Sequence, residues 1–316
     1  FSTLTFLFIS VYLHAQLSRT HYIAPITAAQ GQNAVPQNQY LHISTPFEAV
    51  VKVEVNQLGI GSQLFSVSNA NPLEIFIGNG NNTSFILPST NTASAANNKG
   101  YIIQSDKAVY ASVRLSAGIS QNQAGSLVSK GLSGLGKTFR VGTFDNQRPI
   151  GADDDLINFV SVMATENNTE INFSDLSAGV IIENNTPLST ILNAGESYVI
   201  ALNPALTDSN RDGLIGALVS SNKNIVVNCG SFNGGNSNGT GRDAGFDQIA
   251  PLQTIAVDGQ EFSEYIFVRG NGFDSIERPL LVAHYDNTEV WINGDSTSGD
   301  LLVTLNAGEY INIEGN

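Results

Sequence analysis

Two short motifs occur twice in this chain at nearly the same spacing, and this internal repeat restricts the fold more than any other feature. Residues 168–171 (NTEI) return at 287–290 as NTEV, an offset of 287 − 168 = 119 residues. Residues 192–196 (LNAGE) return at 305–309, an offset of 305 − 192 = 113. This period is longer than a propeller blade of ~40–50 residues and fits a β-sandwich of ~100 residues.

The segments around these motifs have the pattern of short β-strands. Residues 50–55 (VVKVEV), for example, alternate valines on one face with Lys52 and Glu54 on the other. Clusters of Asn and Gly, such as 78–82 (GNGNN), separate these runs and tolerate the positive φ of tight hairpins. We therefore predict an all-β fold of tandem repeated β-sandwich units of about 115–125 residues. A β-propeller-like closed body, with two or three blades per repeat, is the alternative.

The motifs divide the chain into three repeats. A fainter first copy aligns residues 105–109 (SDKAV) with 221–225 (SNKNI), an offset of 221 − 105 = 116. We expect repeat 1 over residues 16–135, repeat 2 over 136–262, and the start of an incomplete repeat 3 over 263–316. In the LNAGE motif, Gly accepts a turn conformation that a Cβ would oppose, so we interpret the motifs as structural.

The first 15 residues (FSTLTFLFISVYLHA) resemble the apolar part of a signal peptide. They are too short for a membrane span, which needs ~20 residues, and no other stretch comes closer. We expect cleavage after Ala15 and export to the cell exterior or the outer cell surface; a buried strand is the alternative. The last residues, 305–316 (LNAGEYINIEGN), have the pattern of a strand, so we also expect further domains beyond Asn316.

Charge and cysteine content exclude several classes of protein. The chain has 14 Lys and Arg against 28 Asp and Glu, a net charge of −14, so nucleic-acid phosphates would be repelled. One Cys cannot form an internal disulfide, and four scattered His residues do not have zinc-finger spacing. Only 13% of residues are charged, so the surface polarity comes mainly from Asn, Ser, Thr, Gln and Gly.

The order of the repeated segments resembles the N-terminal domain of the IgGFc-binding protein family. The segments are YLHISTPFEAVVKVEV (40–55), NNTEINF (167–173), LNAGESYVI (192–200), LVSSNKNIVVNCGSF (218–232), FDQIAPLQT (246–254) and EYIFVRG (264–270). The domain occurs in animal mucus proteins and in large exported proteins of Bacteroidota, such as flavobacterial gliding or adhesion proteins. The resemblance implies a surface protein that uses type IX secretion, with a glycan or glycoprotein ligand.

The sharpest candidate for a metal site lies at residues 208–213 (DSNRDG). Asp208, Asn210 and Asp212 place side-chain oxygens at alternate positions, as in the first half of a calcium loop. The twelfth position is Val219 rather than Glu, which excludes an EF-hand. The hypothesis is Ca²⁺ ligation in a sandwich loop, with an ordinary polar turn as the alternative. The acidic run at 151–155 is a second candidate for binding a cation, with a solvated turn as the alternative.

The long Gly- and Asn-rich loop at 231–247 is the candidate contact surface, because loops of this length are usually functional. We assign ligand contacts to Asn236, Asn238, Arg242 and Asp243. Polar loops of this kind form many weak hydrogen bonds, and multivalency then raises avidity.

No pattern of catalytic residues appears, so we predict that the chain is not an enzyme. No G-x-S-x-G segment occurs, and most glutamates lie in the repeated motifs. The favoured function is a non-enzymatic adhesion or scaffold module of a large bacterial surface protein. One alternative is a carbohydrate-binding accessory module of a secreted degradative enzyme, which an exposed Trp291 would support. A glycosidase is the third, which would need two close carboxylates.

Overall fold

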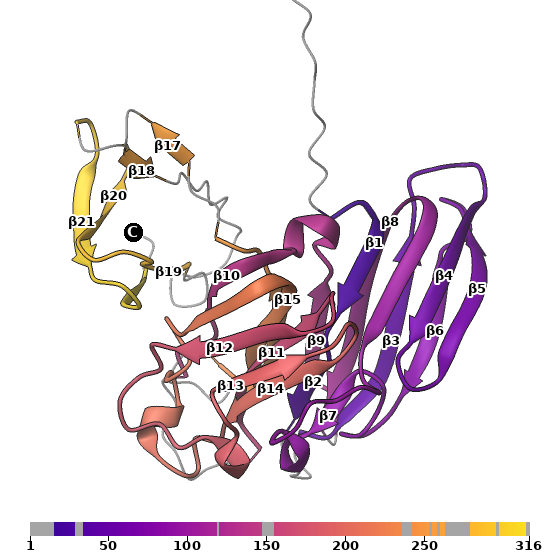
Figure 1. The fold of residues 1–316 in the computed structure, drawn as a ribbon, viewed down its shortest axis with the longest axis horizontal. Helices are drawn as coiled ribbons and strands as arrows, with labels where there is room; N and C mark the ends of the chain where they lie inside the picture. Colours follow the sequence, from indigo (N-terminus) through magenta and orange to yellow (C-terminus); the bar gives the residue numbers. More distant parts are fainter. Residues whose placement is uncertain are drawn as a thin grey trace, which may run out of the picture.

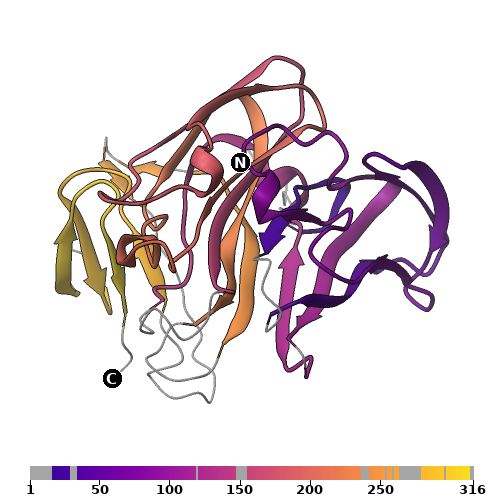
Figure 2. The same ribbon diagram turned by 90° about the horizontal axis from the view of Figure 1, so that it is seen from below.

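The computed structural model describes residues 16–28, 34–118, 120–146, 155–235, 242–252, 255–257, 260–262, 279–294 and 297–313. In these residues the chain forms β-strands joined by turns and short 3-10 helices, with no α-helix. The prediction of an all-β fold is confirmed. Two seven-stranded assemblies and a smaller third group lie in a row (Figures 1 and 2). The proposed signal peptide at residues 1–15 lies outside the described residues.

The first unit is a sandwich organised by one long strand. Its strands are β1 (Ser18–Ile23), β3 (Pro36–Ser44), β4 (Val51–Gln57), β5 (Gly61–Val67), β6 (Leu73–Gly78), β8 (Tyr101–Ala117) and β9 (Gln123–Val128). The first half of β8 pairs with β1 and β4, and the second half pairs with β3 and β9. A short parallel pair, β2 (Ile26–Ala28) with β7 (Ile86–Pro88), and the helix η1 (Ser89–Asn91) complete the unit. Strand β8 therefore joins the two sheets.

The second unit repeats this plan. Its strands are β10 (Gly136–Arg140), β11 (Ile157–Ala164), β12 (Thr169–Ser174), β13 (Ser189–Leu192), β14 (Ser197–Leu202), β15 (Leu218–Gly234) and β16 (Asp243–Ile249), with helices η2 (Gly131–Gly134), η3 (Glu183–Asn185) and η4 (Asp208–Asn210). Strand β15 pairs with β10 and β12 and then with β11 and β16, as β8 does in the first unit. The two long strands begin 218 − 101 = 117 residues apart.

The third group continues the same order. Its strands are β17 (Ile255–Val257), β18 (Gln260–Phe262), β19 (Leu280–Val282), β20 (Thr288–Ile292), β21 (Asp300–Leu305) and β22 (Tyr310–Asn312). Strand β19 pairs with β22, and β20 with β21, just as β11 pairs with β14 and β12 with β13.

Turn geometry explains why the two motifs recur. Asn168 and Asn287 have φ of 54° and 57°, and Gly195 and Gly308 have φ of 82° and 83°. These are left-handed conformations, which Gly and Asn adopt most readily. In each LNAGE turn the Glu carboxylate accepts the N–H of the Asn three residues earlier, at 2.7 Å in the second unit and 2.6 Å in the third.

The first two units share a hydrophobic core. One cluster of buried side chains extends from Leu41, Ile103 and Val113 of the first unit to Phe159 and Phe232 of the second. Because this core crosses the boundary between the units, they form one packed body. A second cluster fills the second sandwich, with Phe139, Ile171 and Val219 among its members.

Candidate functional site

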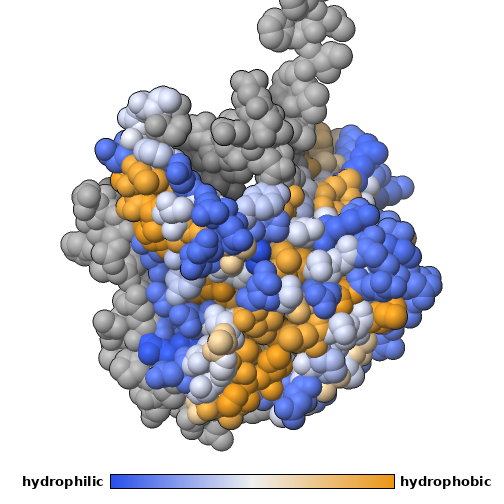
Figure 3. All heavy atoms as spheres, turned by 60° about the vertical axis from the view of Figure 1, so that its left-hand side comes forward, coloured by the Kyte–Doolittle hydropathy of each residue, from blue (hydrophilic) through white to orange (hydrophobic). Residues whose placement is uncertain are grey.

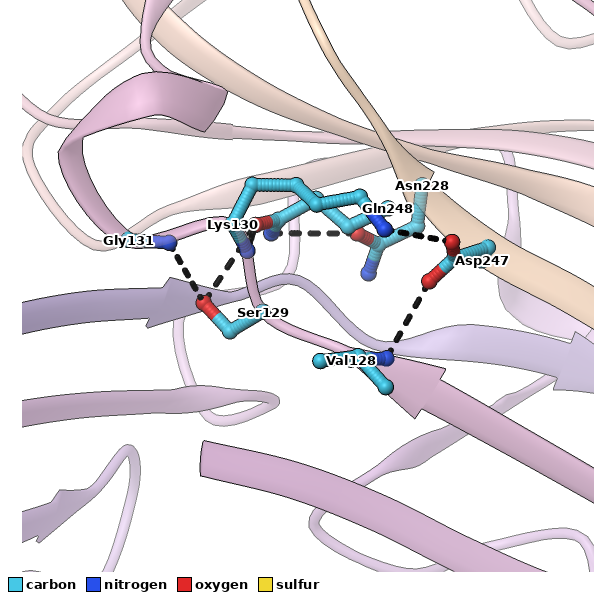
Figure 4. Close-up of polar contacts among 7 residues, drawn as sticks. All are labelled: Val128, Ser129, Lys130, Gly131, Asn228, Asp247 and Gln248. Carbon is cyan, nitrogen blue, oxygen red and sulfur yellow. Dashed lines mark hydrogen bonds and ion pairs between the residues drawn. The ribbon is translucent and has the colours of Figure 1, made fainter. Parts of the chain in front are cut away.

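A network of polar side chains from the second unit holds the end of β9 (Figure 4). One oxygen of Asp247 accepts the backbone N–H of Val128 at 3.1 Å, and the other pairs with Lys130 Nζ at 2.6 Å. Gln248 Oε1 accepts the backbone N–H of Lys130 at 2.7 Å and the hydroxyl of Ser129 at 3.3 Å. The outer edge of β9 is thereby capped by side chains.

The same unit also caps the outer edge of β1. Gln248 Nε2 donates to the carbonyl of Tyr22 at 2.8 Å, and Asn228 Nδ2 donates to the carbonyl of Ala24 at 2.7 Å. Asp243 accepts the backbone N–H of Ala124. Buried backbone carbonyls without partners are costly, so the bonds to Tyr22 and Ala24 help to fix how the two units meet.

Three of the contacts at this junction join residues that are one repeat period apart in the sequence. Asp243 with Ala124, Asp247 with Val128 and Gln248 with Ser129 each join residues 119 positions apart. This separation matches the repeat, so related positions of consecutive units touch each other. Such a contact is head-to-tail rather than two-fold symmetric.

The junction between the second unit and the third group is charged and centres on Arg140. Its guanidinium donates to Asp175 at 2.6 Å and to the carbonyl of Gly216 at 2.8 Å, both in the second unit. Its Nε–H donates to His284 Nδ1 at 3.2 Å in the third group, so this ring nitrogen acts as an acceptor.

Tyr310 forms a second link between the same two parts. Its hydroxyl donates to Asp212 at 2.9 Å. Burial of the ring, together with the charge of Asp212, raises the pKa of Tyr310 above its ordinary value. The hydroxyl therefore remains a donor at neutral pH.

The three proposed calcium ligands have different surroundings. Asn210 is fully buried: its oxygen accepts the N–H of Ile181 at 2.8 Å, and its amide donates to the carbonyls of Ile181 and Asn203. Asp208 is exposed and lies 3.6 Å from Arg211, while Asp212 accepts the bond from Tyr310. In the described residues no group of three or more His, Cys, Asp or Glu side chains could hold a metal. Calcium binding by this loop stays a prediction.

The contact loop predicted at 231–247 is too long, because residues 231–234 continue β15 and residues 243–247 belong to β16. Asn236 and Asn238 lie outside the described residues, as do residues 151–154 of the second acidic run. Arg242 is partly buried, and Asp243 caps β9 at the junction between the units. Contacts of these four residues with a ligand stay a prediction.

The side chains of Cys229 and His21 are buried, and each contacts a backbone carbonyl. Burial raises the pKa of the Cys229 thiol to about 12, and its Sγ–H donates to the carbonyl of Gly142 at 2.8 Å. Burial also lowers the pKa of His21, whose Nε2 lies 2.9 Å from the carbonyl of Val109. Cys229 is therefore a protonated core residue, as its strand pattern indicates.

Three equivalent edge strands leave apolar side chains in solvent. In β5, β13 and β21 the last residue is buried and pairs with the first residue of the neighbouring strand. Leu64, Ile191, Leu301 and Leu302 are exposed on these strands. Figure 3 shows the face that carries the third group, on which apolar side chains gather in two places.

Comparison with known families decides the classification. A family model described as IgGFc binding protein matches residues 124–316, which are 316 − 124 + 1 = 193 of the 316 residues. The chain belongs to the IgGFc-binding protein family. No curated protein and no solved structure gives a significant match.

Family membership gives the general function. IgGFc-binding domains are binding domains rather than enzymes, and they are typically extracellular. The family implies a protein or glycoprotein partner. No helix in the described part of the chain is long and apolar enough to cross a membrane.

Sequence reasoning missed the junction residues and the exposed edges. Gln248 and Asn228 lie in ordinary strand patterns, and Arg140 is an isolated charge. The signal that could have found Gln248 was the repeat itself, since it lies 119 residues after Ser129. Aligning the repeats in the same way would have grouped β5, β13 and β21.

Proposed function

We propose that this member of the IgGFc-binding family is a non-enzymatic adhesion or scaffold module of a large exported surface protein of the Bacteroidota type, which binds glycans or proteins. The observation that carries the proposal is the family match over residues 124–316. The capped junctions support it, because units joined by specific side-chain contacts suit a scaffold that presents binding loops. The connection between β15 and β16 remains our candidate for ligand contacts.

Trp291 supports one alternative function, a carbohydrate-binding accessory module. Its side chain is partly exposed, and its indole N–H donates to the exposed Glu289 at 3.2 Å. A partly exposed indole held by a hydrogen bond offers a ring face to a sugar. Trp291 is the only Trp in the chain, so its fluorescence reports directly on such binding.

Binding of residues 16–316 to arrays of glycans, mucins and an immunoglobulin Fc fragment tests the proposal. We expect selective binding without chemical change of the ligand. Quenching of Trp291 fluorescence by the bound glycan would favour the carbohydrate-binding alternative. Binding to none of the arrayed ligands would contradict the adhesion function.

A further inference from the structure

The outer edge of β5 is left open, whereas the edges of β1, β9 and β14 are covered. Side chains from the second unit cap β1 and β9. Single bridging pairs, Ile182 with Leu202 and Ala96 with Ser197, cover β14. Among the described residues, no hydrogen bond reaches the outer side of β5, whose only strand partner is β4.

The sequence of β5 does not protect this edge. Proteins usually blunt an open edge with charged residues, Pro or a very short strand. Strand β5 has seven residues, GSQLFSV, with no charge and no Pro, and Leu64 at its centre is 80% exposed. Strand β6, an edge of the other sheet, carries Glu74 paired with His42 at 3.5 Å.

The same edge recurs in the other two units. Strand β13 (STIL) has no charged residue and no Pro, and β21 (DLLVTL) has one charged residue, Asp300, at its first position. Among the described residues, each of these strands pairs with one neighbouring strand. The last four residues of β5 and β21, and the four residues of β13, have the same burial pattern. In order, they are exposed, intermediate, exposed and buried. An open edge is thus a property of the repeat rather than of one strand.

An acidic residue lies beside the exposed apolar residue in the first two units. Leu64 is paired across the strands with Glu54, and Ile191 with Glu170. A strand added to this edge would place a side chain next to Leu64 on the same face. A Lys there could cover Leu64 with its methylene groups and carry its ammonium toward Glu54.

We propose that the outer edge of β5, and the equivalent edges of β13 and β21, bind extended segments of a partner protein by strand addition, with basic side chains on the face of Leu64. Backbone hydrogen bonds supply the affinity in this mode, and alternate side chains supply the specificity. Three equivalent edges on one chain make the binding multivalent. The inference names a mode of partner binding and so rests on the proposed function.

A labelled seven-residue peptide of alternating Lys and Val tests this proposal directly. Its binding to residues 16–316 is measured by fluorescence polarisation against the same peptide with N-methyl groups on both backbone edges. The two peptides have the same charge, so only strand addition separates them. We expect the unmethylated peptide to bind at least about tenfold more tightly.

Matched variants locate the binding edge. Leu64→Lys, Ile191→Lys and Leu302→Lys together should abolish the difference between the peptides, because Lys on an edge strand opposes strand addition. The control combines Leu132→Lys, Val50→Lys and Leu206→Lys, which are at least half exposed and lie off these edges. It should leave peptide binding unchanged, and both variants should keep the melting temperature.

Two results would overturn the inference: equal binding of the two peptides, including no binding of either, or full binding by the edge variant. The array experiment is independent of this one. Strand addition without binding of any arrayed ligand would leave the edge proposal standing and remove the adhesion function. Array binding together with equal binding of the two peptides would do the reverse.

Discussion

At the scale of single residues, Asn210 shows how a polar loop becomes a structural clamp. Its side chain joins Ile181 and Asn203, which belong to two different loops of the second unit. We expect Asn210→Ala to lower the free energy of unfolding by about 1–3 kcal/mol, because buried backbone groups lose their partners. Urea denaturation measures the change. In contrast, Asp208→Ala removes an exposed ion pair and should change it by less than about 0.5 kcal/mol.

Calcium binding at Asp208, Asn210 and Asp212 makes a separate prediction for the same loop. A ligand that binds only the native state stabilises it, so calcium should raise the melting temperature by several degrees. The increase should disappear in Asp212→Ala. A flat thermal response of the unmodified protein, or the same response in the variant, would exclude calcium binding at this loop. Magnesium at equal ionic strength is the control.

At the scale of elements, the turn before β15 leaves no room for a side chain. A Cβ on Gly216 would lie 1.9 Å from the carbonyl oxygen of Gly308, and Gly216 has a φ of 85°. Gly216→Ala should therefore push the third group away from the second unit. We expect faster hydrogen exchange in β19 and β22 than in the unmodified protein.

Gly80 is the matched control for this substitution. It also has positive φ, 90°, but nothing lies within 4 Å of its Cβ position. Gly80→Ala should show only the backbone strain, about 1 kcal/mol, with unchanged exchange in β19 and β22. Equal exchange in the two variants would mean that the contact with Gly308 does not hold the third group.

The two-residue period of a strand is visible in the sequence where one face is exposed and disappears where both faces are buried. Strand β4 alternates buried and exposed residues, and the pattern VKVEV shows this directly. Strands β11 and β14 are buried at every position because they lie at the junction with the first unit, so the two-residue period disappears. Strand β15 runs from Leu218 to Gly234, so it includes the first residues of the loop that the sequence predicts at 231–247.

The candidate sites were harder to predict because their groups come from distant parts of the chain. Gln248 reaches Tyr22 and Lys130, which are 226 and 118 residues away. Spacing within one motif, such as 208–213, shows only which oxygens are near in sequence. In the fold, Asn210 turns inward to the backbone and Asp212 faces Tyr310. Local pattern thus identifies turns, whereas the repeat period identifies contacts between units.

At the scale of the whole molecule, the two junctions differ in chemistry. The first two units share a core cluster that includes Phe85 and Phe246, whose ring centroids are 6.1 Å apart. The third group is joined to the second unit through Arg140 with His284 and through Tyr310 with Asp212. Apolar burial contributes roughly 25 cal/mol per Å², whereas one hydrogen bond contributes only about 0.5–1.5 kcal/mol net. The first junction should therefore be the stronger one.

This difference predicts the order of unfolding. We expect β8 and β15 to exchange their amide hydrogens together in one cooperative opening, because one core cannot lose half of its side chains and remain packed. Strands β19 to β22 should exchange at a lower free energy of opening. Gln248 is 1% exposed and forms hydrogen bonds with Tyr22 of β1 and with Lys130, just after β9. Gln248→Leu should therefore weaken the coupling between β8 and β15. Native-state hydrogen exchange measures all three, and separate openings of β8 and β15 in the unmodified protein would show that the shared core does not couple the two units.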